Sequence, residues 1–263
     1  MRIAVHEMPV EINSVATLMT EVQLLHDSHR APIWLRGHGD YNWKLQPTVG
    51  REQTFLGEKV AFNARQERYL LHQFRRYAYA EWGRKLDEWE GLFLARHHGL
   101  PVRIMDWTAN PLVALYFAAE FQRLPVVDGA VWAFRRRRDP ETPDGHEIDV
   151  FEHQDPFAVK GVRMVYPFYN AQRMIGQKGA FTIHGNPGAA LEDPIAHNRV
   201  TAKHIDVLAL HRWRVPSAGR AAIGKELEHM DVNKRRLFPD LDGLAAGLVN
   251  AEILKRVAGK YET

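Results

Sequence analysis

The sequence passes from a strand to a helix within Val102-Arg103-Ile104-Met105-Asp106-Trp107-Thr108-Ala109-Asn110-Pro111. Residues 102–106 have the apolar character of a buried strand. Asn110 and Pro111 predict the start of a helix, because asparagine caps helix N-termini and proline suits the first helical position. A helix start carries free N–H groups that attract anions, so residues 107–110 are candidates for an anion-binding site. The alternative is that Asp106 and Asn110 only cap the helix.

Outside this junction, predicted strands and helices alternate irregularly. Further strands are predicted at 32–37, 130–134, 180–183 and 206–210. Further helices are predicted at 14–26, 65–82, 86–96, 223–233 and 241–257. Residues 140–167 lack periodicity and are expected to form a long loop or a lid. This order predicts an α+β protein, with one domain over residues 1–263 and a central, mainly antiparallel sheet flanked by helices.

The composition is that of a globular protein. Hydrophobic residues make up 45% and charged residues 25% of the chain, which is enough apolar material for a sizeable core. The net charge of +3 is a mild excess and does not imply nucleic acid as a partner. The absence of cysteine excludes disulfides and thiolate zinc sites and fits a reducing cytoplasm. Because the sequence shows neither a membrane-spanning run nor a secretory signal, we expect a cytoplasmic protein without a membrane partner.

Arg36 follows Trp34 and Leu35 at the expected end of a strand. A buried guanidinium is costly unless it meets a carboxylate, a phosphate or carbonyl groups. One interpretation is therefore a structural ion pair. The other is a bidentate clamp on a phosphate or carboxylate, with Gly37 and Gly39 letting backbone N–H groups approach the anion.

Two adjacent histidines, His97 and His98, precede the strand at 102–106. Their spacing does not match the zinc-protease motif, so no metal site is expected. The least favoured functional hypothesis is nevertheless a metal-dependent nuclease that would use both histidines with Asp106. In the following helix, Phe117 is expected to pack in the core, whereas Tyr116 could stack on a planar ring.

Three blocks of the sequence resemble the FRG domain family, whose Phe-Arg-Gly signature appears here as Leu35-Arg36-Gly37. The blocks cover residues 35–51, 97–118 and 173–181. With a similar tail element, the resemblance extends over an FRG-like core at 32–247. The chain departs from the family pattern at three positions: Leu35, Arg96 and His98.

More distantly, the chain resembles ADP-ribosyltransferases in Arg36-Gly37, in Thr108 with Tyr116-Phe117-Ala118, and in Gln177 before a strand. This resemblance implies a split sheet and an NAD-using ADP-ribosyltransferase or NAD glycohydrolase that acts as a toxin or in phage defence. The catalytic residues would be Gln177, Asp106 and Tyr116. The residues that bind NAD would be Arg36, Gly37, His38, His97, Trp107, Thr108, Asn110 and Arg173.

Gln177 leaves open the alternative that the domain is not catalytic. Gln177 cannot supply the negative charge that a glutamate lends to a cationic transition state. Asp106 or Glu192 could compensate, or the domain binds without catalysing. A non-catalytic module would bind a nucleotide, a nucleic acid or a partner, with the basic runs at 135–138 and 234–236 adding phosphate contacts. The expected partners are a nucleotide-like small molecule and, for a transferase, a protein or nucleic-acid acceptor.

Overall fold

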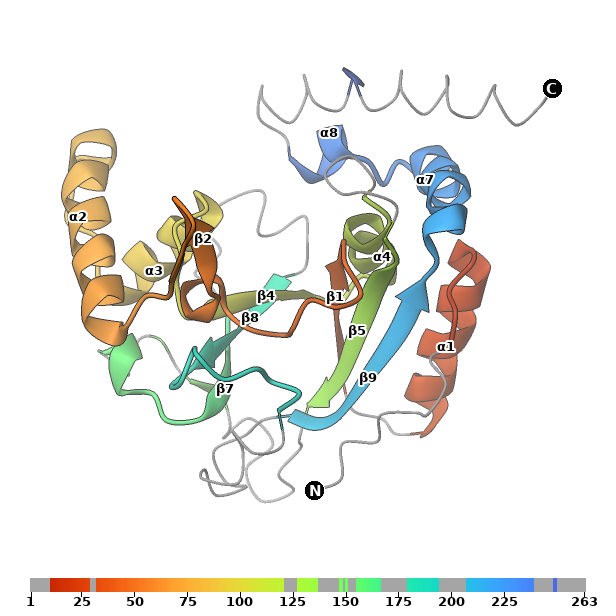
Figure 1. The fold of residues 1–263 in the computed structure, drawn as a ribbon, viewed down its shortest axis with the longest axis horizontal. Coiled ribbons are helices and arrows are strands. Elements are labelled where there is room, and N and C mark those ends of the chain that lie inside the picture. Colours follow the sequence, from red (N-terminus) through yellow and green to blue (C-terminus); the bar gives the residue numbers. More distant parts are fainter. Residues whose placement is uncertain are drawn as a thin grey trace.

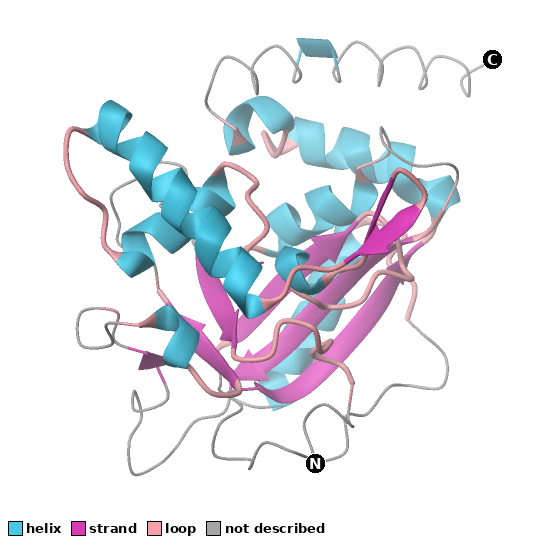
Figure 2. Cartoon of the chain, turned by 60° about the vertical axis from the view of Figure 1, so that its left-hand side comes forward, coloured by secondary structure: helices cyan, strands magenta, loops and turns pink. Residues whose placement is uncertain are grey.

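The computed structural model describes residues 10–28, 32–120, 127–136, 147–148, 150, 155–166, 179–193, 207–238 and 248–249. These residues form a mixed α+β fold in which a seven-stranded sheet is flanked by helices (Figures 1 and 2). The predicted fold class is therefore confirmed. None of the described helices is long and apolar enough to cross a membrane.

The large sheet has the strand order β6-β7-β8-β4-β1-β5-β9. β6 is parallel to β7, and the other neighbouring pairs are antiparallel. The strands are β1 Ile33–His38, β4 Ile104–Thr108, β5 Gly129–Arg136, β6 Glu147–Ile148, β7 Val162–Val165, β8 Gly179–His184 and β9 Val207–Val215. The sequence predicted a strand at or near β1, β4, β5, β8 and β9.

Two predictions about the sheet need correction. β4 begins two residues later than the predicted strand at 102–106, because the backbone N–H of Arg103 donates to Oε1 of Glu67 at 2.8 Å. The predicted loop at 140–167 contains β6 and β7. The run Val162–Val165 is short but apolar enough to pair with β8.

The sheet consists of two groups of strands that meet at β1 and β4. β1 and β5 are in register from Ile33 opposite Arg135 to His38 opposite Ala130, whereas β1 and β4 are in register at Leu35 opposite Thr108. In Figure 1, β4 lies across the view, whereas the antiparallel strands β5 and β9 are steeply inclined. β1 and β4 are therefore joined over a much shorter stretch than β1 and β5.

Helices cover both groups of strands. The described helices are α1 Val15–Ser28, α2 Ala64–Trp82, α3 Glu88–His97, α4 Pro111–Ala119, α7 Arg220–His229 and α8 Lys234–Leu237, with 3₁₀ turns η1 Thr48–Gly50, η2 Pro156–Ala158 and η4 Ser217–Gly219. Helices α1 to α4 confirm their predictions within two residues. The predicted helix at 223–233 ends earlier, because Asp231 adopts a left-handed φ of 57°. Of the predicted helix at 241–257, only residues 248–249 are described, and they are helical.

Separate apolar clusters hold these layers together. Leu18, Leu115 and Ile223 pack α1, α4 and α7 into one core that includes Leu35 of β1. Helices α2 and α3 pack against β4, β7 and β8 in a second core. A third cluster contains Trp107, Trp132 and Phe134 on the central strands.

A buried ion pair joins α2 to the start of β4. Nη2 of Arg103 lies 2.7 Å from Oε2 of Glu67, and the two side chains are 2% and 0% exposed. Removing one partner of such a pair leaves an uncompensated buried charge, so the pair fixes the position of β4 relative to α2. The sequence did not reveal it, since a glutamate within an arginine-rich helix is indistinguishable from a solvated one.

Gly37 permits the closest approach between the sheet and a helix. A Cβ atom at this position would lie 2.0 Å from the carbonyl oxygen of Ala114 and 2.6 Å from the backbone nitrogen of Ala118. Both obstructing atoms belong to the backbone of α4, so a rotamer change cannot remove the clash. The glycine of the Arg36-Gly37 pair is thus required for packing.

We predict that Gly37→Ala lowers the free energy of unfolding by about 3 kcal/mol or more, because α4 must move away from β1. Chemical denaturation monitored by circular dichroism measures this change. Gly179→Ala is the matched control, since its Cβ would meet Trp107 at an ordinary 3.6 Å. Equal stability of the two variants would contradict the packing role of Gly37.

Candidate functional site

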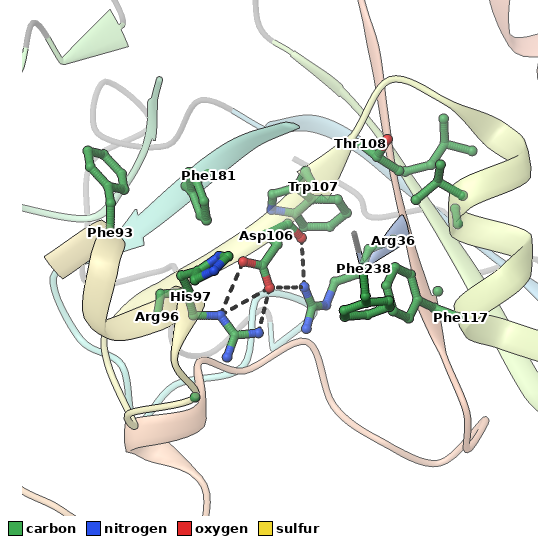
Figure 3. Close-up of a pocket in the computed structure, with 15 residues that line it drawn as sticks. Arg36, Phe93, Arg96, His97, Asp106, Trp107, Thr108, Phe117, Phe181 and Phe238 are labelled. Carbon is green, nitrogen blue, oxygen red and sulfur yellow. Dashed lines mark hydrogen bonds and ion pairs between the residues drawn. The ribbon is translucent and has the colours of Figure 1, made fainter. Parts of the chain in front are cut away.

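A cavity of about 480 Å³ lies where β1 and β4 meet, between α3 and α4 (Figure 3). β1 contributes Arg36 and Gly37 to its lining, and β4 contributes Asp106. Aromatic side chains from four different elements complete the walls. The volume falls within the range of small-molecule sites, about 300–1,000 Å³.

The centre of the cavity is an ion-pair cluster around Asp106. Arg96 donates from Nε to Oδ1 at 3.1 Å and to Oδ2 at 3.0 Å, and from Nη2 to Oδ2 at 2.5 Å. Arg36 donates from Nη1 to the backbone oxygen of Asp106 at 2.7 Å and to Oδ2 at 3.3 Å. One carboxylate thus orients two guanidinium groups, one from β1 and one from the last turn of α3.

The protonation states of the cluster leave it cationic. Partial burial would raise the pKa of Asp106, but Arg96 and Arg36 outweigh it and lower this pKa from 3.8 to about 2. Asp106 in turn raises the pKa of Arg96. Burial lowers the pKa of Arg36 to about 10, and burial together with Arg96 lowers the pKa of Arg51. Near neutral pH, three positive charges therefore surround one negative charge.

His38 accepts a hydrogen bond from Arg36 and so orients its guanidinium. Nε of Arg36 donates to Nε2 of His38 at 3.2 Å, and His38 is only 2% exposed. Burial, followed by the charges of Arg36 and Arg51, lowers the pKa of His38 well below 6.5. The imidazole is therefore neutral and can accept this hydrogen bond. His38, predicted to contact the ligand, is not part of the cavity lining.

Phenylalanine pairs flank the charged cluster on either side (Figure 3). Phe93 of α3 and Phe181 of β8 have ring centroids 5.2 Å apart. On the other side, Phe117 of α4 and Phe238 meet edge to face with centroids 6.2 Å apart. The cavity therefore combines a cationic middle with two aromatic ends.

The structure brings together six of the predicted site residues. Arg36, Gly37, His97, Asp106, Trp107 and Thr108 all line the cavity. Two further predicted residues, Arg173 and Gln177, lie outside the described residues.

Tyr116 and Phe117 occupy each other's expected positions. Tyr116 packs against the core shared by α1, α4 and α7, whereas Phe117 lines the cavity. Successive residues of a helix differ in direction by about 100°, so a shift of one position exchanges a core face for a site face.

At the start of α4, the side chains of Asn110 and Thr108 accept hydrogen bonds from backbone N–H groups. Oδ1 of Asn110 accepts from the backbone N–H of Leu112 at 3.0 Å, and Oγ1 of Thr108 accepts from the backbone N–H of Asn110 at 3.0 Å. The capping interpretation therefore holds for Asn110, while Asp106 binds two arginines instead. The anion-binding potential of this region comes from the guanidinium groups.

Two further candidates, His98 and Glu192, do not line the cavity. His98 packs beside Phe74 at a centroid distance of 6.1 Å, and no group of three metal-binding side chains occurs among the described residues. Glu192 accepts from the backbone N–H of Leu45 at 3.1 Å, and its burial raises its pKa. Glu192 thus holds the loop after β1 rather than lining the cavity.

Sequence reasoning missed several residues of the site. Neither Arg96 nor Arg51 was among the predicted site residues. Phe93, Phe181 and Phe238 carry no local signal, since each looks like an ordinary core residue and they come together only in the fold.

Comparison with known proteins gives one match. Residues 31–125 match the family model described as the FRG domain. No curated protein and no solved structure matches the chain. The matched segment contains Arg36, Arg51, Arg96 and Asp106, whereas Phe181 and Phe238 lie beyond it.

We predict that Arg96→Gln raises the pKa of Asp106 by more than about one unit, because the strongest neighbouring positive charge is lost. Carbon-13 NMR titration of the carboxyl group measures the midpoint, which is about 2 in the unmodified chain. A lowered pKa means that ionised Asp106 stabilises the fold above pH 3.8, and that this contribution disappears as the pH falls through about 2. As the pH falls, Arg96→Gln should lose this contribution of ionised Asp106 to stability at a higher pH than the unmodified chain does.

The control for this titration is Arg84→Gln, which removes an exposed arginine that pairs with Glu90 at 2.6 Å. It should leave the Asp106 midpoint unchanged. An unchanged midpoint in Arg96→Gln would show that the ion pair does not control the carboxylate.

Proposed function

The chain contains an FRG domain, and we propose that this domain binds NAD in the cavity between β1 and β4 and cleaves the bond between nicotinamide and ribose. The products would be those of an NAD glycohydrolase or, with an acceptor other than water, of an ADP-ribosyltransferase. The supporting observation is the arrangement of a cationic cluster between two aromatic ends.

NAD has the complementary arrangement, with an anionic pyrophosphate between two ring systems. Its pyrophosphate would face Arg36 and Arg96, and its rings would contact the pairs Phe93–Phe181 and Phe117–Phe238. Guanidinium groups suit this role because they bind phosphate oxygens with two parallel donors. Stacking on aromatic side chains contributes about 1–3 kcal/mol per base.

Donor groups for a phosphate remain within the cluster. Among the described residues, no hydrogen bond engages Nη2 of Arg36 or Nη1 of Arg96. The two side chains are 14% and 18% exposed. Asp106 therefore holds Arg96 through Nε and Nη2 and Arg36 through Nη1, and within the described part of the chain a further nitrogen of each guanidinium is available to a ligand.

The proposed reaction breaks the C–N bond to nicotinamide, which leaves with the bonding electrons as a neutral ring. The ribose carbon becomes cationic in the transition state, and water or an acceptor nucleophile bonds to it and loses a proton. Asp106 lines the cavity and is ionised at neutral pH. We propose that its carboxylate stabilises this cation, with the predicted contribution of Gln177 to be tested by substitution.

A non-catalytic nucleotide-binding module is the second candidate. It is favoured by the ion pairs that Asp106 makes with Arg36 and Arg96, since these offset the charge that a cationic transition state needs. Binding of NAD without any release of nicotinamide would support this second candidate over the first.

We predict that the purified chain releases nicotinamide from NAD and that Arg36→Gln weakens NAD binding about tenfold or more, because one charge-assisted phosphate contact is lost. Calorimetry measures the affinity, and chromatography measures nicotinamide. Arg84→Gln, which removes an exposed cation outside the cavity, should behave like the unmodified chain. Absence of NAD binding to the unmodified chain would rule out the first candidate and would restrict the second to a nucleotide other than NAD.

Consumption of NAD would fit a role as a toxin or in phage defence. Expression of the unmodified chain in bacteria should then lower cellular NAD and slow growth, and expression of Arg36→Gln should do neither. Unaltered NAD in cells that contain the folded chain would argue against this role.

A further inference from the structure

The hairpin of β2 Gln53–Phe55 and β3 Glu58–Val60 forms a small sheet of its own. Figure 2 shows it as a pair of strands apart from the large sheet. Its tip is Leu56, whose surface is 90% exposed, and Gly57, around which a Cβ atom would meet nothing within 4 Å. The hairpin therefore presents an apolar side chain that the described chain does not cover.

The backbone of the tip makes this leucine unexpected. Leu56 has a φ of 51° and Gly57 a φ of 84°, so both loop residues are left-handed. A two-residue hairpin loop of this kind strongly prefers asparagine followed by glycine, because most side chains are strained there. Leu56 thus combines backbone strain with exposure to water, and neither favours a leucine within the isolated chain.

The hairpin is rooted next to the cationic cluster. Arg51, whose pKa responds to Arg96 and Asp106, lies two residues before the start of β2, and its Nε donates to the backbone oxygen of Gln46 at 2.8 Å. On the other side, β3 leads into α2, where the side chain of Asn63 caps the helix. Arg51 thus links the base of the hairpin to the cationic cluster of the proposed NAD site.

The charges of the hairpin favour a protein as its partner. Glu52 forms an exposed pair with Lys59 at 3.4 Å, which leaves Glu58 as the carboxylate beside Gly57. An apolar tip with an acidic neighbour repels a phosphate backbone, and it suits an apolar hollow bordered by basic side chains. Nucleic acid is accordingly the less suitable partner.

We propose that the β2–β3 hairpin docks a protein acceptor of ADP-ribose, with Leu56 as the apolar contact. This inference rests on the proposed function. In the transfer, a nucleophilic side chain of the acceptor bonds to the ribose carbon, the C–N bond breaks, nicotinamide takes the electron pair, and the proton of the nucleophile passes to solvent.

The test uses the full chain, NAD labelled with phosphorus-32 in its adenylate group, and a bacterial cell extract. Labelled protein is measured on gels, and nicotinamide release is measured in the same reactions and without extract. Leu56→Asn should fold, since asparagine suits the loop. It should lower protein labelling about tenfold and leave nicotinamide release without extract unchanged.

Two controls separate the contact from general effects. Leu56→Met keeps an apolar tip and the same backbone demand, so it should retain labelling. Leu24→Asn removes a different leucine that is 57% exposed, on α1, and should also retain labelling.

Labelling by Leu56→Asn at the level of the unmodified chain would overturn the proposal. So would the absence of labelled protein, or label that a nuclease removes and a protease does not. In those cases, nicotinamide release shows whether the proposed function survives, because that function predicts release with or without an acceptor.

Discussion

The carboxylate of Asp106, held between the guanidinium groups of Arg96 and Arg36, is the interaction around which the candidate site is arranged. It joins β4 to the last turn of α3 on one side and to β1 on the other. The pair β1 and β4 is where the two groups of strands meet, so the same contacts that bridge the sheet also place positive charge in the cavity. With Arg51 nearby, the cluster keeps a positive excess even after Asp106 is counted.

Several buried features fix the walls around this cluster. The ion pair of Glu67 and Arg103 positions the start of β4, and Gly37 lets α4 lie against β1. Nε1 of Trp107 donates to Oγ1 of Thr182 at 2.9 Å, which ties β4 to β8 beneath the cavity. These contacts cost conformational freedom in the core and leave the arginine donors pre-oriented, which lowers the cost of binding an anion.

Features with local signals were predictable from the sequence. The strand ending in Arg36-Gly37 and the helix beginning at Pro111 depend on residue type and neighbours, and both form where expected. Both interpretations of Arg36 were foreseen, and its ion pair with Asp106 is observed. The clamp on an external anion remains a prediction.

Features made by distant segments were not predictable. The aromatic ends of the cavity unite α3 with β8 and α4 with Phe238, and no spacing in the sequence relates these residues. Tyr116 and Phe117 were assigned to the wrong faces because the pattern showed a nearly all-apolar helix without a clear phase. Glu67 was missed because burial of a charge depends on its partner, which lies 36 positions along the chain.

The most direct measurement is a crystal structure of the chain with an NAD analogue whose nicotinamide–ribose link cannot be cleaved. The pyrophosphate should lie within hydrogen-bonding distance, about 2.7–3.2 Å, of both Arg36 and Arg96. One ring should contact Phe93 and Phe181, and the other should contact Phe117 and Phe238. An analogue bound elsewhere, or a pyrophosphate out of reach of both arginines, would contradict the assignment of this cavity to NAD.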